Sequence, residues 1–321
     1  MTDFVQTLVT SLAVGSLYSL IALGYTMVYG ILKFINFAHS DIVVLGAWLS
    51  YAIAKFTAPR IGIELAVAGG APPLWFGGVI LLVTMLICAA IGFLIERLAY
   101  RPLRRSPRLN VLITAIGVSL LLQNAGQLPY VFGASPERMP NLLPNYELLK
   151  LQLDAAPKPA VIIGLVDVTI FVTAAVLMLA LEFVVHRTKF GIAMRAVSFN
   201  TETATLMGVN ANRVISVTFM VGAALAAAAG FLHAMKYPSL QQPAAAAWVL
   251  LGLKAFVAAV VGGIGNLRGA VLGGFVIAAV EQFGGFYLSS SYRDVYVFAL
   301  LIAILLVRPS GILGSTIREK V

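Results

Sequence analysis

Long apolar segments alternate with short polar segments along most of this chain. Clear or probable apolar spans cover residues 5–30, 39–56, 76–96, 110–131, 161–185 and 213–235. Weaker runs cover residues 245–264, 268–288 and 294–307. The longer runs approach or exceed the roughly 20 apolar residues that a helix needs to cross a bilayer. Because the runs do not alternate residue by residue, a membrane β-barrel is disfavoured. The pattern predicts an all-α polytopic membrane protein with about eight to ten transmembrane segments, some of them broken or re-entrant.

The composition supports this fold class. Of the 321 residues, 60% are hydrophobic and 11% are charged, whereas soluble domains carry about 25% charged residues. The single cysteine, Cys88, lies inside an apolar run, so we expect no disulfide. The first residues lack a basic region and a small-residue cleavage site, so we expect no cleaved signal peptide.

Basic residues mark one side of the membrane. Five arginines lie in residues 97–108, and further basic residues lie in 186–213 and in the tail after 307. These segments fall on the same side of the predicted path, and cytoplasmic loops are enriched in Lys and Arg. The net charge of +9 therefore indicates topology and not nucleic-acid binding. We expect an external N-terminus, a cytoplasmic C-terminus, and external linkers at 57–75 and 133–160. The second linker contains the strand-like segment LLKLQL at 148–153.

A polar turn separates the first two apolar runs, in the segment ILKFINFAHSDIVVLGAW at residues 31–48. The residues of interest in this turn are Asn36, Phe37, His39, Ser40 and Asp41. Backbone polar groups at membrane depth must be satisfied by protein or water, so a broken helix is expected here. Asn36 or Ser40 can cap the following helix, and Asp41 suits the positive end of that helix. Two interpretations stay open: these residues only cap and orient a helix, or they line a substrate path.

A second break has the same build. The segment LKAFVAAVVGGIGNLRGAVLGGFVIAAV at residues 253–280 is apolar on both sides of Gly262, Gly263 and Gly265. Paired broken segments mark the translocation pathway in many transporters, so we predict that Asn36 and Gly263 lie near one central passage. Two charged residues flank this break within the weak runs, Lys254 and Glu281. These two residues either pair with each other or extend to the membrane interface, or they have a functional role.

The segment TKFGIAMRAVSFNTETATLMGVNANRVIS at 188–216 lies between two runs on the basic side. Its pattern predicts a short helix over residues 192–198 and a second helix capped by Thr201. Glu202 lies in the first turn of the second helix, and Gly208 can end it in a left-handed conformation. This region is either a docking element for a cytoplasmic partner or an interfacial helix that holds lipid headgroups.

The spacing of Glu202, Thr203 and Ala204 with Gly208 resembles the EAA-type motif of ABC importer permeases. Four blocks resemble the LivH-type branched-chain amino acid permease family in the same order. They are residues 22–48, 188–214, 253–274 and 292–314. The sequence departs from the family at Ser40 and Asp41, where members usually have Gly and Glu; the carboxylate is kept but shortened.

The resemblance implies a type II-like ABC importer permease fold, with residues 1–321 as a single transmembrane permease domain in a bacterial cytoplasmic membrane. It implies a second, LivM-like permease, two cytoplasmic ATPase subunits and a periplasmic substrate-binding protein. It also implies that 188–213 is the coupling-helix region. The coupling residues it assigns are Arg195, Thr201, Glu202, Thr203, Ala204 and Gly208.

Motifs for enzymatic chemistry are missing from the sequence. No lysine follows a glycine, so the chain has no Walker A lysine. The three histidines lack metal-ligand spacing. We therefore expect no enzymatic activity and no cofactor in this chain, with ATP and Mg²⁺ on partner subunits. The alternatives are a urea or short-chain amide permease of the same family, or an ion-coupled secondary transporter that uses Asp41 or Glu281. A membrane hydrolase that uses His39 and Asp41 has little support.

Overall fold

The computed structural model describes residues 1–321 except 64, 66–71, 105, 145, 152–160 and 315–321. The long helices of the described chain are α1 (Thr2–Leu32), α2 (His39–Thr57), α3 (Leu74–Ile95), α4 (Arg108–Gly126), α5 (Leu165–Arg187), α8 (Ala211–Lys236), α9 (Ala246–Gly262), α10 (Leu267–Tyr287) and α11 (Arg293–Val307). Two short helices connect α5 to α8, namely α6 (Lys189–Phe199) and α7 (Thr201–Leu206). Single helical turns are η1 (Ala58–Ile61), η2 (Glu96–Tyr100), η3 (Arg101–Leu103) and η4 (Ser290–Tyr292).

Eight helical segments of the described residues are long and apolar enough to cross a membrane, and α9 is a shorter apolar helix. This confirms the predicted all-α polytopic class. Four short strands form two antiparallel pairs. The strands are β1 (Glu137–Arg138) with β4 (Ser239–Leu240), and β2 (Glu147–Leu151) with β3 (Val161–Gly164). The strand expected at 148–153 is therefore confirmed over its described residues, whereas residues 152 and 153 lie outside them.

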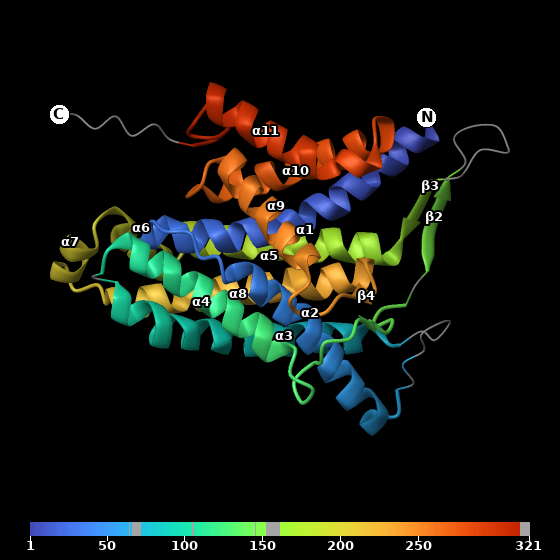
Figure 1. Ribbon diagram of the computed structural model, residues 1–321, viewed down its shortest axis with the longest axis horizontal. Helices are drawn as coiled ribbons and strands as arrows, with labels where there is room; N and C mark the ends of the chain where they lie inside the picture. Colours follow the sequence, from blue (N-terminus) through green and yellow to red (C-terminus); the bar gives the residue numbers. More distant parts are fainter. Residues whose placement is uncertain (64, 66–71, 105, 145, 152–160, 315–321) are drawn as a thin grey trace.

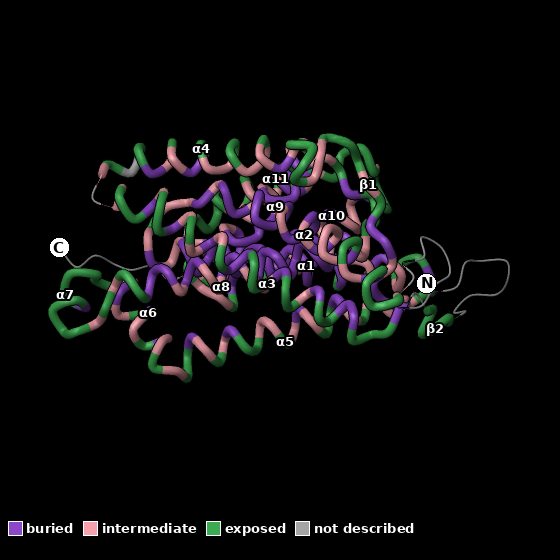
Figure 2. Tube along the Cα trace, turned by 90° about the horizontal axis from the view of Figure 1, so that it is seen from below, coloured by how far each residue is buried: buried purple, intermediate pink, exposed green. Residues whose placement is uncertain are grey.

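Most helices run along the long axis of the molecule (Figure 1). The N-terminus, β2 and β3 lie at one end, which we call the β-strand end, and α7 lies at the opposite end, the α7 end. Helix α1 runs through the centre, where it packs against α5, α8, α9 and α10, and its residues 13–28 are all buried. Figure 2 shows α4 and α5 along opposite edges, with much of their surface exposed. Their apolar side chains suit contact with lipid or with another membrane subunit.

Small residues allow the central helices to approach closely. Gly46 of α2 lies against the backbone of Ala227 in α8, and Gly230 lies against Val43. A Cβ added at Gly230 would fall 2.0 Å from the Val43 carbonyl oxygen. Small residues at helix crossings allow this kind of packing in membranes. On α8 the small residues between Gly222 and Gly230 supply this packing surface.

Candidate functional site

The first predicted break is present between α1 and α2. Lys33 ends α1 in a left-handed conformation, with a φ of 54°. Helix α2 then begins at His39, whose Nε2 lies 2.3 Å from the position of a Cβ on Gly24 of α1. Gly24 precedes the end of α1 at Leu32 by eight residues, or about 12 Å of helix. The chain therefore turns back into the bundle, and α2 begins inside it.

The predicted cap of α2 is wrong. The helix is preceded by Ala38, and no side chain caps it. The Asn36 amide oxygen instead accepts a hydrogen bond of 2.6 Å from the Tyr100 hydroxyl. The Ser40 hydroxyl donates to the Phe37 carbonyl oxygen at 3.0 Å. Asn36 is thus held by a residue distant in sequence, and Ser40 lies too far into the helix to cap it.

Asp41 lies in the first turn of α2, as predicted. Gln123 of α4 donates a hydrogen bond of 2.9 Å to Asp41 Oδ1. The other carboxylate oxygen, Oδ2, is buried and has no hydrogen-bond partner within the described part of the chain. An unpaired buried oxygen is costly, so this carboxylate is a candidate contact for a bound polar group.

The second predicted break, between α9 and α10, is also present. Gly263 and Gly265 adopt φ values of 106° and 99°, which favour glycine. The end of α9 is paired with the segment after α11. Ile312 N donates to the Val261 carbonyl at 2.8 Å, and Leu313 N donates to the Gly262 carbonyl at 2.9 Å. These bonds satisfy helix-end carbonyls that would otherwise be unpaired at membrane depth.

The two breaks have different immediate neighbours. Asn36 contacts Tyr100, whereas Gly263 packs against Gly311 and Gly314. The helix pairs on either side of the two breaks, α1–α2 and α9–α10, contact each other through Ser40 of α2 and Gly252 of α9. A Cβ added at Gly252 would fall 2.2 Å from the Ser40 Cβ. The shared central passage stays a prediction.

The segment at 188–216 forms the two short helices expected, α6 and α7. Asn200 caps α7, because its Oδ1 accepts a hydrogen bond of 2.9 Å from Thr203 N. The prediction of Thr201 as the cap is therefore wrong by one residue, and the Thr201 hydroxyl donates to the Val197 carbonyl. Gly208 follows α7 with a φ of 86°, which confirms the left-handed end.

The tip of this element carries exposed apolar side chains that the sequence pattern did not single out. Phe199, Leu206 and Met207 are 94%, 87% and 81% exposed. Glu202 is exposed beside them, and Ala204 is buried. Large exposed apolar side chains next to charged ones are typical of a protein-binding surface.

Helix α6 is bonded to the ends of two long helices. The Ser198 hydroxyl donates to the Gly30 carbonyl of α1 at 2.8 Å, and the Arg195 guanidinium donates to the Val185 carbonyl of α5. A cavity of about 550 Å³ at the α7 end is lined by Gly30, Arg195, Ser198 and Gly265, among others. The structure therefore brings one predicted coupling residue, Arg195, together with one predicted break residue, Gly265.

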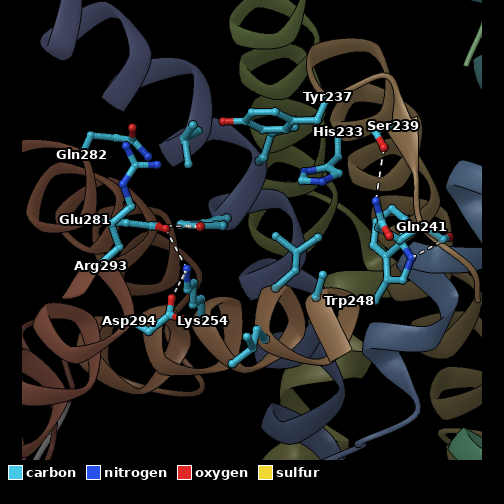
Figure 3. A pocket seen from close by; sticks show the side chains of 16 residues that line it. His233, Tyr237, Ser239, Gln241, Trp248, Lys254, Glu281, Gln282, Arg293 and Asp294 are labelled. Carbon is cyan, nitrogen blue, oxygen red and sulfur yellow. Dashed lines mark hydrogen bonds and ion pairs between the residues drawn. The ribbon is translucent and has the colours of Figure 1, made fainter. Parts of the chain in front are cut away.

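A second cavity, of about 340 Å³, lies between α1, α8, α9, α10 and α11 toward the β-strand end (Figure 3). Lys254 Nζ lies 2.7 Å from Glu281 Oε1 and 2.6 Å from Asp294 Oδ1. The Tyr18 hydroxyl donates to Glu281 Oε2 at 2.6 Å. Of the alternatives left open for Lys254 and Glu281, the structure shows pairing, and Asp294 and Tyr18 are additions that the sequence did not indicate.

The opposite wall of this cavity is aromatic and apolar. It includes Trp248, whose indole N–H donates to the Gln241 carbonyl at 3.2 Å, and the rings of His233 and Tyr237. Burial, together with nearby Glu281, raises the pKa of Tyr237, so its phenol is neutral. His233 of α8 also lines the cavity, and its Nδ1 has no partner among the described residues.

An aromatic cluster lies farther along the same face of α1. Tyr25 follows Tyr18 by seven residues, which is close to two turns. The Tyr25 ring centroid lies 4.6 Å from that of His39 and 5.9 Å from that of Phe256. These three rings join α1, the beginning of α2 and α9.

Broken helices, buried charges and two cavities at opposite ends define a membrane protein of the transporter class. The chain belongs to the family described as branched-chain amino acid transport system / permease component, which matches residues 7–305. It is 39% identical to the Pseudomonas aeruginosa permease protein BraD, over 99% of this chain and 98% of that protein. It is also 39% identical to LivH of Escherichia coli K12, with the same coverage. A probable LivH of Methanocaldococcus jannaschii is 27% identical, over 94% of this chain and 89% of that protein. No solved structure matches the chain significantly.

Proposed function

We propose that this chain is the membrane-spanning permease subunit of an ABC importer that carries branched-chain or related hydrophobic amino acids into the cytoplasm. The observation that carries the proposal is the end-to-end similarity to two proteins named high-affinity branched-chain amino acid transport system permease proteins. The cavity at the β-strand end supports it, because the cavity combines an apolar wall with charges of both signs.

The proposed setting is a bacterial cytoplasmic membrane, with the N-terminus periplasmic and the C-terminus cytoplasmic. The basic loop supports this orientation, because Arg104 donates a 2.7 Å hydrogen bond to Asn212 at the beginning of α8, and α8 begins beside α7. Arginine-rich loops favour the cytoplasmic side. The proposed partners of this chain are a LivM-like permease, two cytoplasmic ATPase subunits and a periplasmic binding protein. In this proposal the chain itself holds no cofactor.

In this proposal the α6–α7 element docks into a cleft of an ATPase subunit. The exposed tip supplies the contact surface, and the bonds from Ser198 and Arg195 transmit its displacement to α1 and α5. We expect Glu202→Lys and Gly208→Pro to abolish substrate-stimulated ATP hydrolysis while membrane insertion persists. Thr205→Ala, on an exposed side chain of the same helix, is the control. Normal coupling in either variant would count against the docking role.

The translocation path in this proposal passes the α1–α2 and α9–α10 breaks. The residues assigned to it stay as predicted from the sequence: Asn36, Phe37, His39, Ser40, Asp41, Gly262, Gly263 and Gly265. Their support is the contact between Ser40 and Gly252, together with the burial of His39 and Asp41.

The deciding experiment measures uptake of labelled leucine, urea and a short-chain amide by the assembled complex in proteoliposomes. We expect ATP-dependent accumulation of leucine. Accumulation of urea or the amide alone would assign the alternative substrate. Uptake that persists on an ion gradient without the ATPase subunits would instead indicate an ion-coupled transporter.

A further inference from the structure

We propose that the cavity at the β-strand end binds the charged backbone of a free amino acid, with the amino acid's side chain against the apolar wall. This inference rests on the proposed function and names the part of the substrate that this chain contacts. The cavity volume of about 340 Å³ lies within the roughly 300–1,000 Å³ typical of small-molecule sites.

The charges of the cavity suit a zwitterion. Its lining includes two basic side chains, Lys254 and Arg293, and two acidic ones, Glu281 and Asp294, so their formal charges cancel. Figure 3 shows these four residues together on one side of the cavity, with Trp248 on the other. An amino acid carries one charge of each sign, so it can be paired on both groups. A simple anion or cation would instead leave the occupied cavity with a net charge, which is costly in a buried site.

Three polar groups are available for a ligand. Arg293 forms no ion pair within the described part of the chain, so its guanidinium can bind a carboxylate. The Asp294 side chain is 47% exposed and uses only Oδ1 for Lys254, so Oδ2 can accept from an ammonium group. His233 Nδ1 is buried on the aromatic wall, and no described residue satisfies it.

A contribution to stability is a weak explanation for this cluster. Replacing buried ion pairs by apolar residues is often neutral or stabilising, so their presence alone is weak evidence for a stabilising role. Ionisable groups on membrane helices usually mark substrate or ion pathways. The apolar wall, with Leu17, Trp248 and Leu251, provides the surface that a branched aliphatic side chain requires.

The test measures binding by saturation-transfer NMR in nanodiscs. The sample contains both permeases and the ATPase subunits but omits the binding protein, which would bind the ligand itself. The probes are leucine, leucinamide, which lacks the carboxylate, and 4-methylpentanoate, which lacks the ammonium group. We expect transfer to the methyl groups of leucine and roughly 10–100-fold weaker binding of both analogues. Equal binding of all three would overturn the inference.

Two variants assign the charges to this chain. We expect Arg293→Gln to remove the preference for leucine over leucinamide, and Asp294→Asn to remove the preference for leucine over 4-methylpentanoate. The Arg293 residue is exposed and the Asp294 residue is only partly buried, so the fold should tolerate both substitutions. Arg308→Gln, at the other end of α11, is the control. Unchanged preferences in both variants would place the site elsewhere and overturn the inference.

Leucine uptake by the complete complex is measured in parallel, so that the two proposals fail separately. Uptake without saturation transfer would overturn the binding site and leave the proposed function intact. Absence of leucine uptake would overturn the proposed function.

Discussion

A methyl group added at Gly230 tests how tightly the crossing of α2 and α8 fixes the broken helix. The new Cβ would lie 2.0 Å from the Val43 carbonyl oxygen and 2.9 Å from the Ala47 nitrogen. Both are backbone atoms, and ordinary contact begins at 3.4 Å, so the helices must separate by about 1.4 Å, the difference between 3.4 and 2.0 Å. Overpacking of this kind costs ~1–3 kcal/mol. Alanine's better helix propensity returns roughly 1 kcal/mol.

Gly117→Ala is the matched control, because it makes the same change in α4 where nothing lies within 4 Å. It gains the helix propensity without the clash. The assay is thermal unfolding of the purified complex in detergent. We expect Gly230→Ala to melt about 2–12 °C below Gly117→Ala, with a parallel loss of transport. A Gly230→Ala protein that melts at or above the control would refute the packing argument.

Three further predictions concern other contacts. Arg104→Met leaves the fully buried Glu96 carboxylate without its ion-pair partner. This should lower the free energy of unfolding by ~3–5 kcal/mol, and adding Glu96→Leu should recover most of that loss. Asn200→Ala removes the cap of α7, which should destabilise this helix by about 1 kcal/mol. The variant should therefore show weaker substrate-stimulated ATP hydrolysis, while the amount of assembled complex is unchanged. Gly252→Ala meets Ser40 at 2.2 Å and should slow leucine uptake in proteoliposomes; an unchanged rate would argue that α9 and α2 need not stay in contact.

The helices could be predicted from the sequence because the membrane makes length and apolarity decisive. Each of the nine predicted segments has a counterpart, and the second begins at His39 as predicted. Both breaks were visible as well, because polar or glycine-rich turns between apolar runs are costly unless they are built into the fold. The one-residue error at the beginning of α7 arises because two good capping residues, Asn200 and Thr201, are adjacent.

The partners of the buried polar groups could not be predicted in the same way. Asn36 bonds to Tyr100, and Glu96 accepts from Ser216, 120 residues away. Periodicity describes which face of a helix is buried, and it contains no information on which distant helix covers that face. Tyr18 illustrates the limit: in an apolar run it has the features of a core residue, and only the fold shows that its hydroxyl bonds to Glu281.

Helix α9 connects most of the features that the sequence pointed to separately. Along its 17 residues, or about 25 Å, Gly252 meets the beginning of α2, Lys254 enters the charged cavity and Phe256 reaches the aromatic cluster. Gly262 then ends the helix at the second break, where its carbonyl is bonded by the segment after α11. Because these contacts lie on one short element, a displacement of α9 would alter the charged cavity, the aromatic cluster and the second break together. The sequence shows here only a weak apolar run that contains a lysine, and the fold places that run in contact with the beginning of α2, the charged cavity and the second break.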